Sequence, residues 1–492
     1  MFAQFEPEVC FSGDRTRVDV ILRVVERFVV HVGDVRVEGA DRTSSALILS
    51  LSTLHQGDVY RPSRARETED ALLALGIFTG VNVGPEDPEL AARNKSVVIR
   101  VTERKTQFLD FHLGLSTGEG VRAGFEYGYR NLFGYAIGFN LRVRFAYQFF
   151  VLQDATLQRR LKSLPLSDQL ERHVSLGFTF PFVGLPHVRS SLTATHQRDN
   201  ERDFGFTKNG LELAFIYTPL RELSSTFSSG IESNDIGLFP EVSESLSQLL
   251  LTTTDTRLRQ LLLVPEGRTT LVTLAGGIHL DLRDNPFTPH RGYLFDVGGE
   301  WARTLRTQGV NIGGMREEFF SDHLKLTAGV RAYAPLGHDV VFAAQLRVGR
   351  IVHLSSSSET YPNRLFFMGG VDTLRGYLED EMVPQDLADQ IARSADLTVG
   401  DIVRGGDAFF LIRSELRFPI YKDVAGGVFA DLGNLWARAQ NFNPFDLRPT
   451  AGIGLRIATP IGPLAFDYGF VLLRRKAINE GFGAFHFSIG LF

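Results

Sequence analysis

Cysteine is nearly absent from this sequence. The 492 residues include one cysteine, Cys10, which excludes an internal disulfide framework and a cysteine-rich metal site. Scarce cysteine is consistent with a protein of the cell envelope. Long apolar runs are missing as well, because no stretch reaches the roughly 18 apolar residues that a transmembrane helix requires. The sequence therefore argues against helical membrane spans.

Signals for several other protein classes are also missing. The N-terminus has no basic segment followed by an apolar one, so no signal peptide is visible. None of the 12 histidines belongs to an H-E-x-x-H zinc motif. The net charge of −5 at pH 7 argues against nucleic-acid binding, which usually needs a basic surface. We predict a protein that is not an enzyme and that requires no metal, cofactor or nucleic acid.

Glycine and phenylalanine are abundant, with 48 and 40 residues, and the mean hydropathy is −0.02. A transmembrane β-barrel has such values, because its strands alternate apolar and polar residues. Alternation with a period of two is clear in residues 109–116, 137–145 and 410–418. Soluble β-sandwiches share this pattern, but its repetition from residue 107 to residue 492 favours a closed barrel.

The barrel region is long enough for about sixteen antiparallel strands, at about 24 residues per strand and loop. An even number of strands places both barrel ends on one side of the membrane. We predict long loops at residues 157–171, 242–265 and 355–404. Loops of this length are usually functional or disordered. The fold class is therefore mainly β, with a transmembrane antiparallel barrel after a small α+β domain.

The α+β domain is predicted at residues 28–105. Its elements read strand, helix, helix, strand, strand, and two helices packed on one sheet form such a domain. Gly76 ends the second helix, at a position where glycine readily adopts a positive φ. Residues 1–27 contain a strand at 18–27. We interpret it as the last strand of a preceding domain of the same type, so that the chain is expected to be truncated.

One loop motif stands out within residues 355–404. Gly369 and Gly370 permit a tight turn, and Gly376 lets the backbone reverse at a positive φ with Arg375 at the apex. Residues 369–377, GGVDTLRGY, resemble the loop-six motif G-G-x-x-x-[VIL]-R-G-[FY] of BamA- and TamA-type outer-membrane assembly factors. Leu374 and Tyr377 occupy the aliphatic and aromatic positions.

Other segments resemble the same family. Residues 74–81 are similar to a turn of its POTRA domains, and residues 281–292 are similar to its R-D-N-P turn. The resemblance implies a POTRA domain at 28–105, the remnant of a preceding one at 1–27, and a sixteen-stranded barrel at 107–492 with loop six at about 355–404.

The resemblance also implies partners for Arg375 inside the barrel. Glu415 lies in a segment similar to the family's E-x-R-F-P strand, and Asp431 lies in one similar to its F-x-D-x-G strand. Alternation independently places both carboxylates on the polar strand face. Arginine suits this role, because its planar fork stays charged and can bond two carboxylate oxygens at once. The sequence leaves two roles open for these ion pairs: they act in the mechanism, or they only fix the loop.

The last strand resembles the signal that outer-membrane barrels present to the assembly machinery, because Phe485, Phe487, Ile489 and Leu491 alternate and the sequence ends at Phe492. Closure pairs this strand with the first one, near residues 108–116. In the family this seam opens sideways and templates an incoming strand. Glycine weakens strands. The predicted seam comprises Leu109, Phe111, Gly483, Phe485, Phe487, Gly490 and Phe492.

The resemblance implies an insertion factor of the bacterial outer membrane. Its POTRA domain, in the periplasm, would receive unfolded outer-membrane proteins, and the seam would template their insertion. Periplasmic chaperones, accessory lipoproteins and an inner-membrane protein are further candidate partners. The alternative is a two-partner-type secretion pore of the same superfamily. A barrel enzyme and a passive porin fit less well, and a BamA-type role is not separable from a TamA-type role.

Overall fold

The computed structural model describes residues 2–12, 16–148, 154–181, 184–185, 187–252, 264–312, 315–316, 319–393, 403–457, 459 and 464–489. The chain divides into two compact units. One comprises Met1–Phe108, Gly128–Phe139 and Phe178–Gly184, and the other comprises Leu109–Tyr127, Asn140–Gly177 and Leu185–Phe492. In the described part, no helix has the length and apolar character needed to cross a membrane.

The chain starts with a two-stranded antiparallel hairpin of β1 (Phe2–Phe11) and β2 (Val18–Phe28). The sequence predicted β2 but not β1. Apolar side chains on the hairpin are exposed, among them Phe11 at 64%, Val20 at 58% and Leu22 at 60%. A two-stranded ribbon is only marginally stable by itself, because it buries little apolar surface.

The next elements form a small α+β domain. They are β3 (His31–Glu38), α1 (Ser45–Ser50), α2 (Pro62–Ala74), β4 (Phe78–Pro85) and β5 (Asn94–Glu103). Strand β5 is central, parallel to β3 and antiparallel to β4. Ile48 from α1, Leu72 from α2 and Ile99 from β5 are fully buried in one core. Gly76 follows α2 at φ +72°, as expected for a glycine that ends a helix.

Gly39, after β3, provides a test of this domain. Its φ is +81°, and a Cβ would lie 2.2 Å from the carbonyl oxygen of Val101. We expect Gly39→Ala to destabilise the domain by about 1–3 kcal/mol, since it adds backbone strain to this clash. Gly57→Ala is the matched control, because Gly57 has φ +91° but nothing within 4 Å of the added carbon. The measurement is proteolytic cleavage of the domain in the folded chain against temperature. Equal effects of both substitutions would contradict the prediction.

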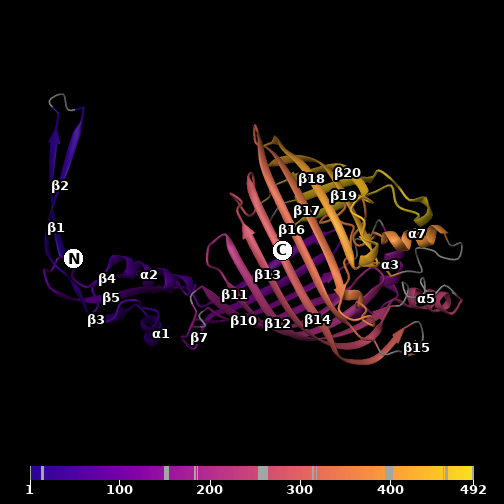
Figure 1. Cartoon of the computed structure of the whole chain (residues 1–492), viewed down its shortest axis with the longest axis horizontal. Helices are drawn as coiled ribbons and strands as arrows, with labels where there is room; N and C mark the ends of the chain where they lie inside the picture. The colour runs from indigo at the N-terminus through magenta and orange to yellow at the C-terminus, as the bar shows by residue number, and fades with distance from the viewer. Residues whose placement is uncertain are drawn as a thin grey trace. The chain divides into compact units, whose positions relative to one another are not determined.

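The remaining strands close into a barrel (Figure 1). The wall strands are β6 (Gln107–Ser116), β7 (Gly120–Leu132), β8 (Ile137–Tyr147), β9 (Leu170–Phe180), β10 (Val188–Asn200), β11 (Phe204–Tyr217), β12 (Leu223–Leu238), β13 (Glu266–Asp281), β14 (Gly292–Ile312), β16 (Asp322–Gly337), β17 (Val340–His353), β18 (Ala408–Tyr421), β19 (Val424–Trp436), β20 (Arg448–Ile457), β21 (Leu464–Val471) and β22 (Gly483–Ile489). The short β15 (Met315–Arg316) pairs with the end of β14, which itself pairs with β16.

The described residues thus form a closed antiparallel barrel of 16 strands after a POTRA-type α+β domain, and the predicted fold class is confirmed. The strand period explains which side chains face the lumen. On β18 and β19, Leu416 and Val428 are 37% and 51% exposed on the outside, whereas Glu415 and Asp431 are buried on the inside. The alternation seen in the sequence therefore identified the two faces of these strands.

Helices gather at one end of the barrel (Figure 1). They are α3 (Ala155–Lys162), α4 (Leu166–Gln169), α5 (Pro240–Thr252) and α7 (Gln385–Arg393), with the 3-10 turns η1 (Pro362–Arg364), η3 (Ala439–Asn441) and η4 (Lys476–Ile478). Residues 157–171 and 242–265 had been predicted as loops, but α3, α4, α5 and the start of β9 occupy much of them. Residues 253–263 lie outside the described part.

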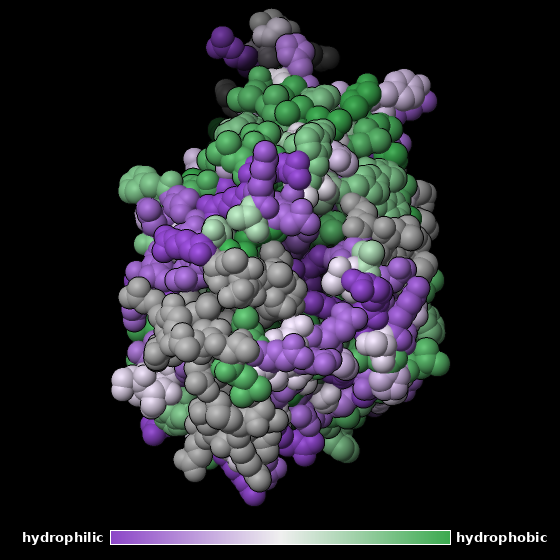
Figure 2. Space-filling view, turned by 90° about the vertical axis from the view of Figure 1, so that its right-hand side faces the viewer, coloured by the Kyte–Doolittle hydropathy of each residue, from purple (hydrophilic) through white to green (hydrophobic). Residues whose placement is uncertain are grey.

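These helices form a cap with its own hydrophobic core. Leu161 of α3, Leu246 of α5 and Leu387 of α7 pack with Phe204, Phe239 and other buried residues in one cluster. Hydrophilic residues cover much of the described outer surface at this end (Figure 2). Apolar positions at helical spacing explain why these insertions fold instead of remaining open loops.

Candidate functional site

Loop six, defined here as residues 354–407 between β17 and β18, places the motif inside the barrel. Gly369 and Gly370 have φ of +117° and +98°, and a Cβ on Gly369 would lie 2.2 Å from the carbonyl oxygen of Leu378. The Gly370 N–H donates to the Tyr377 carbonyl oxygen at 3.0 Å and closes the turn. Leu374 and Tyr377 are buried in a hydrophobic cluster that loop six forms with the neighbouring strands. The two adjacent glycines thus form the tight turn that the sequence predicted.

Gly376 serves a different purpose from the predicted one. Its φ is not positive, so it does not reverse the backbone. A Cβ there would lie 2.6 Å from the Thr450 side chain on β20 and 3.2 Å from the Phe470 carbonyl oxygen on β21. Gly469 of β21 is similarly close, because its Cβ would lie 2.2 Å from the Arg375 carbonyl oxygen. Glycine is needed at both positions so that loop six can approach the wall.

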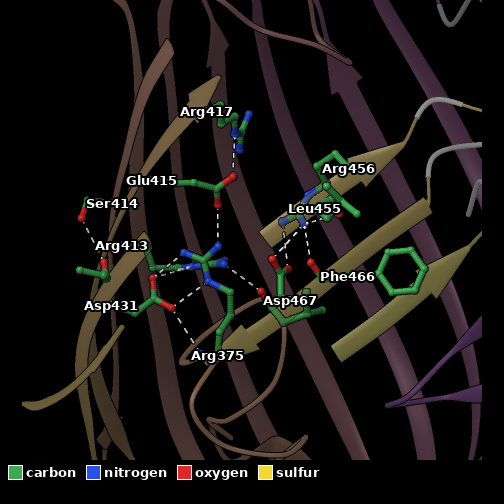
Figure 3. A network of polar contacts seen from close by, with 12 residues as sticks. Arg375, Arg413, Ser414, Glu415, Arg417, Asp431, Leu455, Arg456, Phe466 and Asp467 are labelled. Carbon is green, nitrogen blue, oxygen red and sulfur yellow. Dashed lines mark hydrogen bonds and ion pairs between the residues drawn. The ribbon is translucent and has the colours of Figure 1, made fainter. Parts of the chain in front are cut away.

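Arg375 binds both predicted carboxylates (Figure 3). Its Nε and Nη2 donate to Asp431 Oδ2 and Oδ1 at 2.9 and 2.7 Å, and its Nη1 donates to Glu415 Oε2 at 2.5 Å. The guanidinium carbon also lies 3.5 Å from the centre of the Phe429 ring. Side-chain exposure is 1% for Arg375, 0% for Asp431 and 10% for Glu415. The structure therefore brings the three predicted residues together in a bidentate ion pair plus a second carboxylate.

Two further arginines belong to this cluster (Figure 3). Arg417 Nε donates to Glu415 Oε1 at 2.9 Å, and Arg413 Nε lies 3.6 Å from Asp431 Oδ1. Three guanidinium groups thus surround two carboxylates. A lumen cavity of about 550 Å³ borders Arg375, Glu415 and Arg413. Water in such a cavity reduces the cost of losing an ion pair below that in a dry core.

Loop six also contacts the last strands, through residues that the sequence reasoning missed. His486 of β22 approaches the carbonyl oxygen of Arg375, with Nε2 at 3.1 Å. The Tyr377 hydroxyl donates to Glu480 Oε1 at 3.2 Å, and Arg448 Nη1 donates to the same oxygen at 3.1 Å. Burial raises the pKa of Tyr377, so its phenol stays protonated as a donor. His486 alternates with Phe485 and Phe487, and this polar position in an apolar strand was the available signal.

A carboxyl pair lies between loop six and the β10–β11 turn. The side chains of Glu201 and Asp380 are hydrogen-bonded to each other. Burial, with the nearby carboxylate of Asp380, raises the pKa of Glu201, and burial likewise raises the pKa of Asp380. The positive charges of Arg202 and Arg404 oppose this rise in the Asp380 pKa but do not cancel it. A raised carboxyl pKa means that the folded form is favoured while the proton is bound and is penalised as the pH rises through that pKa.

We therefore expect Asp380→Asn to stabilise the cap at pH 8 and to change little at pH 4. The asparagine keeps a hydrogen bond to Glu201 without the second charge, and it tolerates the φ of +50° at this position. Cleavage of the cap by a protease, compared with the parent chain at both pH values, measures the effect. A substitution that is neutral or destabilising at pH 8 would refute the assignment.

The seam joins β22 to β6, as predicted. In the described part the two strands pair at two positions, Ser116 with Ser488 and Leu115 with Ile489. The Thr117 N–H also donates to the Phe487 carbonyl oxygen at 2.9 Å. By contrast, β22 and β21 pair at the seven positions from 483 to 489.

The predicted seam residues fall into separate places. Leu109 and Phe111 lie on β6 away from the two paired positions and are 52% and 75% exposed. Gly483 and Phe485 pair with β21, and a Cβ on Gly483 would lie 2.2 Å from the Gly469 carbonyl oxygen. Gly483 thus permits close approach of β21. Gly490 and Phe492 lie outside the described residues.

Two arrangements resemble hydrolase chemistry but do not provide it. Residues 114–118, GLSTG, fit G-x-S-x-G, but Ser116 sits where β6 turns into β7 and accepts a hydrogen bond from Glu119 N–H. The motif requires a strand-to-helix turn instead. Ser358 Oγ lies 3.1 Å from His353 Nδ1, yet it donates to the Asp322 carbonyl oxygen at 2.9 Å. His353 Nε2 also lies 3.1 Å from Asp407 Oδ2, but the single hydroxyl proton of Ser358 goes to the Asp322 carbonyl oxygen instead of to the imidazole.

The described residues also contain no group of three or more histidine, cysteine, aspartate or glutamate side chains suited to a metal. The ion pairs and hydrogen bonds described above connect loop six to the strands beside the seam.

Comparison with known protein families shows which family the chain belongs to. The Omp85 superfamily domain matches residues 121–492, and the surface antigen variable number repeat, POTRA, matches residues 30–104. The chain belongs to the Omp85 superfamily. Among curated relatives, the outer membrane protein assembly factor BamA of Nitratidesulfovibrio vulgaris is 23% identical over 498 residues, a match that covers 100% of this chain and 55% of that protein. The chain spans about half the length of the curated relatives it matches.

Solved structures share this fold. BamA from Haemophilus ducreyi lacking POTRA domains 1–3 has a TM-score of 0.72 at 16% identity, covering 99% of this chain and 89% of that one. CdiB from Acinetobacter baumannii has a TM-score of 0.54 at 13% identity, covering 99% and 77%. The predicted membership in the BamA-type superfamily is confirmed. The barrel and these relatives indicate an outer-membrane location.

The arginine cluster yields a stability prediction. Asp431→Asn leaves the buried Arg375 with one carboxylate fewer, and we expect it to destabilise the barrel by up to about 3–5 kcal/mol, less where lumen water compensates. Asp235→Asn is the control, because Asp235 pairs with Arg268 at 2.9 Å in a bridge whose side chains are 46% and 59% exposed. Exposed pairs contribute about 0–1 kcal/mol. Heat-modifiable gel mobility against temperature measures both, and equal shifts would contradict the prediction.

Proposed function

We propose that this protein is an outer-membrane β-barrel assembly factor. It receives unfolded outer-membrane proteins through its POTRA domain in the periplasm and templates their insertion at the seam between β6 and β22. The observation that carries the proposal is the connection between the arginine cluster and the seam. One loop residue, Arg375, binds β18 and β19 with its side chain and contacts His486 of β22 with its carbonyl oxygen.

The proposed mechanism uses the chemistry of strand edges. Strand β22 pairs with β6 on one side, at the seam, and with β21 on the other. A strand edge offers backbone N–H and C=O groups that a client strand can bind. Opening the seam thus exchanges the pairing of β6 with β22 for pairing with a client strand. In this proposal the protein uses no catalytic residue and no cofactor.

Loop six defines which strands move together. The Arg375 cluster and the Tyr377–Glu480 contact join the loop to β18, β19 and the segment before β22. These strands therefore keep their arrangement while β22 separates from β6. The secretion-pore alternative requires a continuous channel for an extended chain. Curated relatives that match over nearly the whole chain are outer membrane protein assembly factors, which favours assembly over that alternative.

A charge-exchange series tests this function. Arg375→Glu should leave a folded barrel, seen as heat-modifiable mobility, but reduce insertion of client barrels into liposomes. The added carboxylate is repelled by Asp431 and Glu415, so the loop leaves its site. Asp431→Arg in the Arg375→Glu background should restore part of the insertion, because it re-forms an ion pair with reversed charges. The exposed exchange Arg268→Glu with Asp235→Arg is the control and should insert clients normally.

Two results would count against the proposal. If the parent chain inserts no client, the assembly function is wrong. If all exchange variants insert clients as the parent does, loop six is a scaffold without a role in insertion. Failure of Arg375→Glu to fold would move the test to Arg375→Gln, which removes the charge without adding repulsion.

A further inference from the structure

Loop six has a second arginine that no motif marks. Arg364, at the end of η1, forms ion pairs with Glu232 of β12 and Glu300 of β14. Their side chains are 11%, 12% and 28% exposed. As at Arg375, a single guanidinium group from the loop joins carboxylates on two strands. No local sequence pattern marks this contact, because Arg364 is 132 positions from Glu232 and 64 positions from Glu300.

The neighbouring residue extends this contact into a ring of hydrogen bonds. Asn363 Nδ2 donates to Asn234 Oδ1 at 2.9 Å, and Asn234 Nδ2 donates to Glu232 Oε1 at 2.7 Å. Glu232 and Asn234 are two residues apart on β12, so both face the lumen. Lys325 of β16 also donates to the Arg364 carbonyl oxygen at 2.8 Å. Three strands, β12, β14 and β16, thus bind two consecutive loop residues through hydrogen bonds and ion pairs.

The contacts of residues 363 and 364 form an anchor on a stretch of loop six that is also packed. The rings of Tyr361 and Phe319 lie 4.3 Å apart, centre to centre, and Phe366 is buried in a second cluster. The anchor adds ion pairs of fixed geometry to this packing and joins the loop to β12 and β14. Loss of these ion pairs should therefore loosen the start of loop six at this wall.

The place of this anchor in the barrel gives it a role. Counted from β6 around the closed sheet of 16 wall strands, β12 and β14 are seventh and ninth. They flank the point opposite the junction of β22 with β6. Arg375 instead binds β18 and β19, and its carbonyl oxygen contacts β22. Loop six is consequently fastened at both sides of the lumen, once opposite the seam and once beside it.

We propose that Arg364 is a positioning residue of the seam: it ties loop six to the wall opposite the seam, so that loop six is a strap that limits how far β22 separates from β6. This inference rests on the proposed assembly function for its purpose, but not for its test. The strap keeps the C-terminal strands from swinging outward, and releasing it increases the open population of the seam.

Disulfide trapping of the seam tests the strap in the full chain. Cys10→Ser removes the one cysteine, and Ser116→Cys with Ser488→Cys places a pair at directly opposed positions of β6 and β22. In this background we expect Arg364→Gln and Glu300→Gln to slow disulfide formation by about fivefold, the lower end of typical coupling between two sites. Arg364→Lys should restore part of the rate, since it retains the charge without the fork.

Arg268→Gln is the matched control, because it removes an exposed ion pair between β13 and β12. It should leave the trapping rate unchanged. A folded Arg364→Gln variant that traps at the parent rate would overturn the proposal and reduce the anchor to local stabilisation. If Arg364→Gln does not fold, Glu300→Gln decides in the same way. Client insertion by the parent chain, measured separately, distinguishes a wrong strap from a wrong assembly function.

Discussion

A buried guanidinium group is the feature on which the lumen of this barrel depends. Arg375 is 1% exposed, and removing an arginine from water is costly unless fixed acceptors replace its hydration. Asp431 supplies two of these acceptors in one plane and Glu415 supplies a third. The loop can therefore stay in the lumen only while β18 and β19 hold both carboxylates at the correct spacing. Strand register and loop position thus depend on each other.

The same constraint explains the glycines around the site. A charged side chain reaches its partners only if the backbone that carries it comes close to the wall. Gly376 and Gly469 leave no Cβ in the gap between loop six and β20–β21. Gly369 and Gly370 adopt backbone angles that other residues rarely tolerate. These glycines position the arginine, whereas the carboxylates retain it.

Much of this arrangement was predictable from the sequence, and the limits have physical causes. Alternation with a period of two identified the inward faces of β18 and β19, and the resemblance to a loop motif connected Arg375 to Glu415 and Asp431. The partners of Arg364 were not predictable, because Glu232 and Glu300 are ordinary polar residues of alternating strands, and only closure of the barrel brings them to the loop. Gly376 was assigned to a reversed backbone, since a sequence does not reveal how close a distant strand lies. The cap helices were expected as loops, because their apolar positions are buried only when the folded barrel brings them against one another and against strand residues such as Phe204 and Leu271.

The contacts of loop six have one more consequence, which concerns the order in which the barrel forms. Arg364 reaches back 132 positions to Glu232, and the Arg375 carbonyl oxygen reaches forward 111 positions to His486. Contacts over such separations form late, since the chain entropy of closing long loops must be lost first. Neither the strands before loop six nor those after it can satisfy the loop alone. The loop contacts and the closure of the sheet therefore form together, late in folding, because each needs strands from both sides of the loop.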